Sequence, residues 1–134
     1  MIDLEQVIFS EVEAVVLNEY PDIFMISTIE GYPEDFPAVV FYEADNSVVN
    51  RYRTQDTSDQ RVSLMYEVQI YSNLAHGAKT QTKEILSVID EQMLKMGFSR
   101  VTTQQITNLY QRNIARRLAR YEAVADAEGV IYRR

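Results

Sequence analysis

The segment RVSLMYEVQIYSN (61–73) constrains the fold more than any other part of the sequence. Its apolar side chains fall at every second position, at Val62, Leu64, Tyr66, Val68 and Ile70. Strict alternation of this kind is typical of a β-strand with one face in the core, since successive side chains of a strand point to opposite faces. The chain therefore needs a sheet with something packed against one side of it.

The two segments that can supply this cover have helical periodicity. Residues 4–19 place apolar side chains at three- and four-residue steps, with Asp3 as the predicted N-cap and Pro21 as the stop. Residues 78–96 carry a second apolar stripe, and Gly97 suits the position just beyond a helix C-terminus. Six further segments are predicted as strands: 23–29, 38–44, 47–54, 98–108, 114–125 and 130–133.

The expected order is α-β-β-β-β-α-β-β-β, with exposed loops over 30–37, 54–60 and 109–113. Residues 126–129 (Asp-Ala-Glu-Gly) suit the turn of a C-terminal β-hairpin. One mixed sheet with two helices on one face buries both helical stripes and one sheet face. The predicted fold is therefore a two-layer α+β sandwich, formed as a single domain over residues 1–134.

Charge is distributed unevenly along the chain. The formal net charge is -7, yet no lysine or arginine precedes Arg51, and that stretch holds eleven acids. The remainder holds thirteen basic residues against nine acids, a net charge of +4. The two halves can face each other within one subunit, or an acidic face of one subunit can meet a basic face of the next. The overall acidity argues against dedicated nucleic-acid binding.

The sequence contains no recognisable catalytic or cofactor-binding motif. Cysteine is absent, and the four glycines lie too far apart for a phosphate-binding loop. The single histidine, His76, has no serine or carboxylate partner at a catalytic spacing. Asp56 and Asp59 lack the rest of a calcium-loop pattern, so they are interpreted as solubilising loop residues. We expect no enzyme, no metal and no cofactor, and a function carried by surfaces.

The N-terminal segment MIDLEQVIFSEVE lacks a basic region and interrupts its apolar positions with acids, unlike a signal peptide. No stretch approaches the length of a membrane span. We therefore expect a protein that does not act at a membrane.

Four stretches together resemble a known family: FPAVVFYEADNSVVNRYR (36–53), YEVQIYSN (66–73), AKTQTKEILSVIDEQMLKMGF (78–98) and RYEAVADAEGVIYRR (120–134). In this order and spacing they resemble the tail terminator, or tail completion, proteins of long-tailed bacteriophages, the lambda terminator-like group. The resemblance covers about residues 20–134.

The resemblance implies a structural protein without catalytic activity that caps the tail tube as a ring, usually a hexamer. The implied partners are further copies of the chain, the major tail tube protein and a head-completion or neck protein, with DNA only passing through the lumen. The implied location is the virion, at the tube end near the head, after assembly in the cytoplasm of the bacterial host. Two alternatives remain open: a head-completion or neck connector protein, and a small ligand-binding α+β domain.

Contacts with neighbouring subunits or the tube are expected on the charged surfaces and the C-terminal hairpin. We expect the acidic N-terminal region of one subunit to meet the basic C-terminal region of the next. The candidate interface residues are Glu11, Glu13, Glu19, Arg51, Arg53, Asp56, Asp59, Arg61, Arg116, Arg117, Arg120, Tyr121, Tyr132, Arg133 and Arg134.

Overall fold

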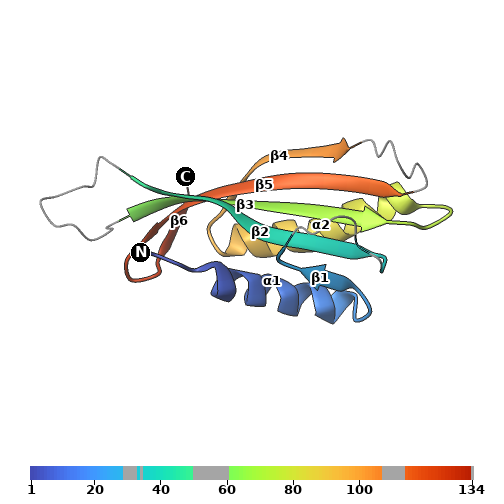
Figure 1. Cartoon of the computed structure of the whole chain (residues 1–134), viewed down its shortest axis with the longest axis horizontal. Coiled ribbons are helices and arrows are strands. Elements are labelled where there is room, and N and C mark those ends of the chain that lie inside the picture. The colour runs from blue at the N-terminus through green and yellow to red at the C-terminus, as the bar shows by residue number, and fades with distance from the viewer. Residues whose placement is uncertain (29–32, 34, 50–60, 107–113, 134) are drawn as a thin grey trace, which may run out of the picture.

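The computed structural model describes residues 1–28, 33, 35–49, 61–106 and 114–133. Within them it contains two helices and a mixed six-stranded sheet, which confirms the predicted α+β fold (Figure 1). The elements are α1 (Glu5–Glu19), β1 (Phe24–Ile26), β2 (Ala38–Val48), β3 (Arg61–Ser72), α2 (Ala78–Lys95), β4 (Ser99–Ile106), β5 (Ala115–Asp126) and β6 (Ile131–Arg133).

The strands lie in the order β1-β2-β3-β5-β4, and β6 pairs with β5. Among the described strands, only β1 and β2 pair in parallel, and every other pair is antiparallel. The longest ladder joins β3 to β5, from Arg61 opposite Asp126 to Ser72 opposite Ala115. Strand β5 therefore lies inside the sheet, with β3 along one edge and both β4 and β6 along the other.

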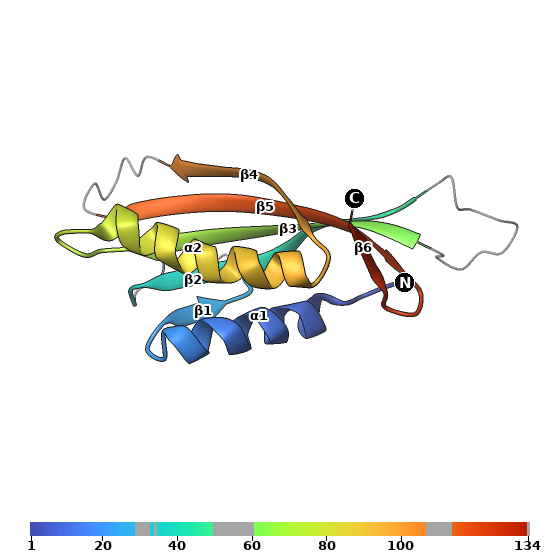
Figure 2. The same cartoon turned by 180° about the vertical axis from the view of Figure 1, so that it is seen from behind.

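Both helices cover the same face of the sheet, as Figures 1 and 2 show from opposite sides. The alternating side chains of β3 that predicted this arrangement, from Val62 to Ile70, are fully buried beneath the helices. Phe41 stacks on Tyr66 with ring centroids 5.4 Å apart, and Tyr66 meets the edge of Phe98 at the same distance. Aromatic pairs of this geometry each add about 0.5–1.5 kcal/mol beyond the area they bury.

The helix ends follow the sequence signals closely. The Asp3 carboxylate accepts a hydrogen bond from the Glu5 N–H at 3.2 Å, but Leu4 occupies the N-cap position, one residue later than predicted. At the end of α2, Gly97 has φ +100°, the left-handed conformation expected of a glycine at this position. Gly97 also lies close to Ile131 of β6. A Cβ added at Gly97 would be 3.2 Å from the Ile131 carbonyl oxygen.

Residues predicted as two strands, 38–44 and 47–54, share one strand as far as the structure describes them. Strand β2 runs without interruption from Ala38 to Val48, and residues 50–54 lie outside the described part of the chain. Its pairing with β3 shifts by one residue between Glu43 and Asp45. A β-bulge of this kind absorbs an extra residue while the ladder continues on both sides of it, so the polar residues after Phe41 do not end the strand.

Among the described helices, none has both the length and the apolar character that crossing a membrane requires.

Candidate functional site: the open face of the sheet

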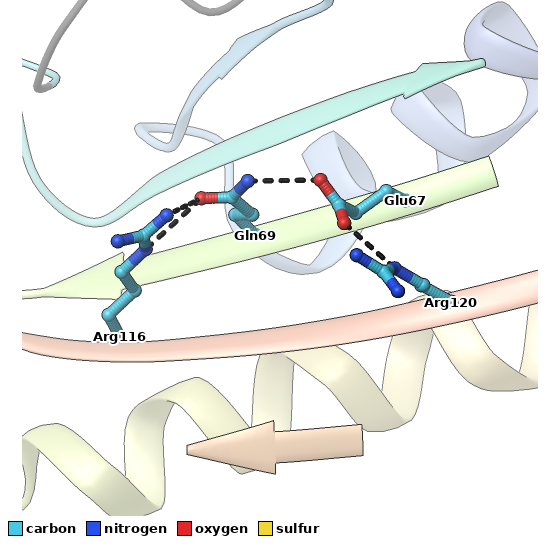
Figure 3. A network of polar contacts seen from close by, with 4 residues as sticks. All are labelled: Glu67, Gln69, Arg116 and Arg120. Atoms are coloured by element: carbon cyan, nitrogen blue, oxygen red, sulfur yellow. Dashed lines mark hydrogen bonds and ion pairs between the residues drawn. The ribbon is translucent and has the colours of Figure 1, made fainter. Parts of the chain in front are cut away.

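The sheet face turned away from the helices carries a network of polar side chains (Figure 3). We call this surface, formed by the side chains of β2, β3 and β5 that point away from α1 and α2, the open face. Glu67 and Gln69 of β3 alternate with the core side chains of that strand, and Arg116 and Arg120 stand beside them on β5. No described helix covers this face (Figures 1 and 2).

Five side chains of the open face are joined by direct hydrogen bonds. Arg120 Nε donates to Glu67 Oε1 at 3.0 Å, and Gln69 Nε2 donates to the other Glu67 oxygen at 3.1 Å. Arg116 donates to Gln69 Oε1 through Nε, at 3.1 Å, and through Nη2. Tyr71 donates its hydroxyl to the same oxygen at 2.9 Å, and the Arg116 guanidinium lies 5.4 Å from the centre of its ring.

Burial makes this network more than a set of surface contacts. Glu67 and Gln69 are each only 5% exposed although no described helix lies over them. A buried carboxylate is costly unless charged or polar donors satisfy it, and here Arg120 and Gln69 both do so. Beside the network, Ala38, Val40 and Ile114 are also buried, in a second small apolar cluster that includes Tyr71.

The three clustered arginines of β5 do not share one surface. Arg116 and Arg120 lie on the open face, whereas Arg117 pairs across the ladder with the core residue Ile70 and points to the helix side. Alternation along a strand dictates this separation. Arg117 lines a groove between α2 and β4, described below, and therefore cannot act together with the other two against one partner surface.

Tyr121 must be removed from the predicted interface. Its side chain is fully buried on the helix side, because it occupies a core-facing position of β5. Its hydroxyl donates to Asp90 Oδ1 at 2.9 Å. Burial, followed by this hydrogen bond, raises the pKa of Tyr121.

Hydrogen bonds to Asp126 stabilise the turn of the C-terminal hairpin. Asp126 Oδ1 accepts the N–H groups of Glu128 and Val130, at 2.9 and 3.0 Å, and Asp126 Oδ2 accepts the Tyr132 hydroxyl at 3.0 Å. These hydrogen bonds lower the pKa of Asp126, and the bond from the Val130 N–H has the largest effect. The guanidinium of Arg61 lies 4.9 Å from the centre of the Tyr132 ring. Arg61 and Tyr132 thus contact each other, and the hairpin completes the sheet.

A polar cluster ties the start of α1 to the bulged part of β2. Glu5 Oε2 accepts the Glu43 N–H at 2.8 Å, and the Tyr66 hydroxyl donates to Glu43 Oε1 at 3.2 Å. Burial raises the pKa of Glu43, and the negative charges of Glu5 and Asp3 raise it further, while the hydrogen bond from Tyr66 opposes them. The carboxyl group of Glu43 is therefore more easily protonated than an exposed glutamate.

Beyond Glu5, helix α1 carries three more acidic side chains, two of which lie on its outer surface. Glu11 and Glu19 are exposed and Glu13 is half-buried. None of the three forms an ion pair with another residue in the described ranges, where the ion pairs are Lys95–Glu91, Arg100–Asp90 and Arg120–Glu67. Helix α1 therefore presents negative charge that the described part of the same chain does not neutralise.

The remaining candidate residues lie outside the described part of the chain, or their side chains do. Arg51, Arg53, Asp56, Asp59 and Arg134 lie outside the described residues, as does the whole of the predicted loop 54–60. Arg133 ends β6, but its side chain is not described.

Two observations concern small-molecule chemistry. His76 is exposed in the turn before α2, and no set of three metal-ligating side chains converges within the described ranges.

A groove beside α2 is lined by Leu86 and by the polar residues Lys83, Ser87, Asp90, Arg100, Thr103 and Arg117. The sequence analysis missed it, although Lys83, Ser87 and Asp90 stand at spacings that share one helix face.

No protein-family model matches this chain, and neither does any curated protein.

Proposed function

We propose that the protein is a structural subunit that caps a phage tail tube as a ring and ends tube growth. The proposal starts from the four stretches that resemble the tail terminator proteins. It adds to that resemblance a physical account of how copies of the chain contact one another.

The observation that carries the proposal is that two unlike surfaces lie on opposite sides of the subunit. On the helical side, helix α1 presents Glu11 and Glu19, which no described residue neutralises. The open face, on the other side of the sheet, presents Arg116 and Arg120. A contact between two different surfaces repeats from copy to copy, and it closes into a ring when the rotation divides a full turn.

The arginines keep part of their hydrogen-bonding capacity for such a contact. The Arg120 side chain is 46% exposed, and the described part of the chain uses only its Nε. A guanidinium has five N–H donors, so a carboxylate from the next copy can bind to those that remain. Exposed ion pairs are each worth only about 0–1 kcal/mol, so charge complementarity sets the register and rate of assembly more than its affinity.

The test reverses charge on α1 and leaves the internal network of the open face intact. The variant Glu11→Lys with Glu19→Lys changes two exposed side chains, and Glu91→Lys with Glu128→Lys is a control with the same change in net charge. Each protein is added to growing tubes of the tail tube protein encoded by the same genome. Electron microscopy measures tube length and the presence of terminal rings.

We expect the parent and the control to give short tubes that end in a ring, and the α1 variant to leave tubes long and uncapped. If the parent fails to cap tubes, the proposed function is wrong. If the α1 variant caps tubes as well as the parent, the function stands but the contact lies elsewhere. A parent ring that binds only head or neck proteins would favour the head-completion alternative.

A further inference from the structure

The groove beside α2 lies on the helix side of the sheet, away from the open-face network. It has a volume of about 260 Å³ and is open to solvent along the boundary between α2, β4 and β5. Helix α2 contributes Lys83, Ser87 and Asp90 from one face, at i, i+4 and i+7. Thr103 comes from the neighbouring edge strand and Arg117 from β5.

Arg117, which lines this groove, has an unused hydrogen-bond donor. Its Nε is buried, yet no described residue accepts a hydrogen bond from it. A buried donor without an acceptor costs about 1–3 kcal/mol, and more when the group is charged. A bound oxygen atom would remove this cost once the Arg117 side chain turned its Nε–H toward the groove.

The net charge of the groove lining favours an anionic ligand. Three cationic side chains, Lys83, Arg100 and Arg117, line it together with one carboxylate, Asp90. Asp90 is already engaged, since its Oδ1 accepts from Arg100 Nη1 at 3.2 Å and from the buried Tyr121 hydroxyl at 2.9 Å. The lining therefore keeps a formal charge of +2.

We propose that this groove binds a phosphate group. A phosphate monoester carries about −1.5 to −2 charges at neutral pH, close to the excess of the lining, whereas a carboxylate carries one. Its three terminal oxygens can accept from Arg117 Nε, from the Lys83 ammonium and from the free donors of Arg100. The Thr103 hydroxyl offers a further donor, and Asp90 holds Arg100 in position.

This inference is independent of tube capping, since neither the acids of α1 nor the arginines of the open face take part in it. The phosphate can belong to a small phosphorylated molecule or to the backbone of a nucleic acid. The chemistry of recognition is the same, and the test separates the two sources.

The experiment titrates the full chain with inorganic phosphate at constant ionic strength, against sodium chloride as the reference. Two-dimensional ¹H–¹⁵N spectra follow the Arg117 Nε–H resonance, and thermal unfolding follows stability. We expect a saturable shift of this resonance and a higher Tm in phosphate than in chloride. Lys83→Gln should weaken phosphate binding about two- to fivefold, the effect of one exposed ion pair. Arg117→Met should abolish it.

The matched control is Lys95→Gln, which removes an exposed lysine of the same helix outside the groove and should bind phosphate like the parent. A second arm replaces phosphate with a short single-stranded oligonucleotide. Oligonucleotide binding that phosphate displaces, and that Lys83→Gln weakens, assigns the site to a nucleic-acid backbone. A response to phosphate alone assigns it to a small ligand.

Two results would overturn the proposal. One is an Arg117 Nε–H resonance that moves no further in phosphate or oligonucleotide than in chloride. The other is phosphate binding that Lys83→Gln leaves as strong as in Lys95→Gln. Both remain decisive if Arg117→Met fails to fold, because Lys83 is exposed and its replacement leaves the core unchanged.

Discussion

The ion pair between Glu67 and Arg120 decides whether the open face is ordered within a single subunit. We predict that the two side chains are energetically coupled in the isolated protein. The perturbation is a double-mutant cycle built from Glu67→Gln, Arg120→Gln and the variant that carries both. Glutamine keeps the approximate size of both side chains and removes their charges.

The expected coupling follows from the unequal exposure of the two partners. Exposed ion pairs contribute about 0–1 kcal/mol, whereas hydrogen bonds to charged groups in protected sites contribute about 1.5–3 kcal/mol. The Glu67 side chain is 6% exposed and that of Arg120 is 46% exposed, so this pair lies between the two classes. We therefore expect a coupling energy of about 1–2 kcal/mol.

Glu67→Gln alone carries a further cost. Both carboxylate oxygens of Glu67 act as acceptors, one for Arg120 and one for Gln69. A glutamine turns one of these acceptors into an NH₂ group, which then faces a donor. Glu67→Gln should therefore lower stability at least as much as Arg120→Gln.

Urea denaturation followed by circular dichroism measures the four stabilities, at low salt and at 1 M sodium chloride. In a chain of 134 residues, each kcal/mol also shifts Tm by about 3–5 °C, which gives an independent check. Salt should reduce the coupling only in part, since one partner is buried. A coupling below about 0.3 kcal/mol would refute the reasoning, and Arg120 would then be free for another partner.

Three further predictions concern other parts of the fold. Glu43→Gln should raise stability at pH 7, because the raised pKa of Glu43 means that the folded state disfavours its charged form. Urea titrations should show this gain shrink as the pH falls through the raised pKa. The gain should be gone below pH 4.5, the ordinary pKa of a glutamate, where the folded and unfolded states both hold the proton. Gly97→Ala should cost about 1–3 kcal/mol in denaturation experiments, from its positive φ and the approach to Ile131, and more than Gly77→Ala, where φ is also positive but no atom lies near. Replacing exposed His76 with alanine should leave tube capping unchanged in the same assay as the parent, and a loss of capping in a folded variant would reveal a missed site.

Local sequence signals predicted most of the fold. The alternation of Val62 to Ile70 and the apolar stripe of residues 78–96 each report on burial within a single element, so each was readable from one stretch of chain. The continuity of β2 was not, since its bulge between Glu43 and Asp45 depends on pairing with β3. Polar residues in that stretch suggested a break between two strands. Pairing with β3 on both sides of the bulge instead keeps them in one strand.

The candidate site was less predictable because its partners lie far apart in the sequence. Glu67 and Gln69 alternate with core residues and would be expected in solvent, but Arg120 and Arg116 cover them from about fifty positions away. Only the register between β3 and β5 brings these side chains together. Alternation along β5 separates Arg117 from Arg116, which a count of basic residues cannot detect.

The position of β5 inside the sheet also has a consequence for biosynthesis. Strand β4 leaves the ribosome before β5, yet the strand with which it pairs is β5. Until residue 126 has emerged, β3 exposes a long unpaired edge and β4 has no place in the sheet. Unpaired edges and late, non-local pairing favour aggregation and slow folding. Slowed synthesis or a premature stop just before Ala115 should therefore leave a nascent chain that depends on chaperones, although more than four-fifths of this sequence has already been made.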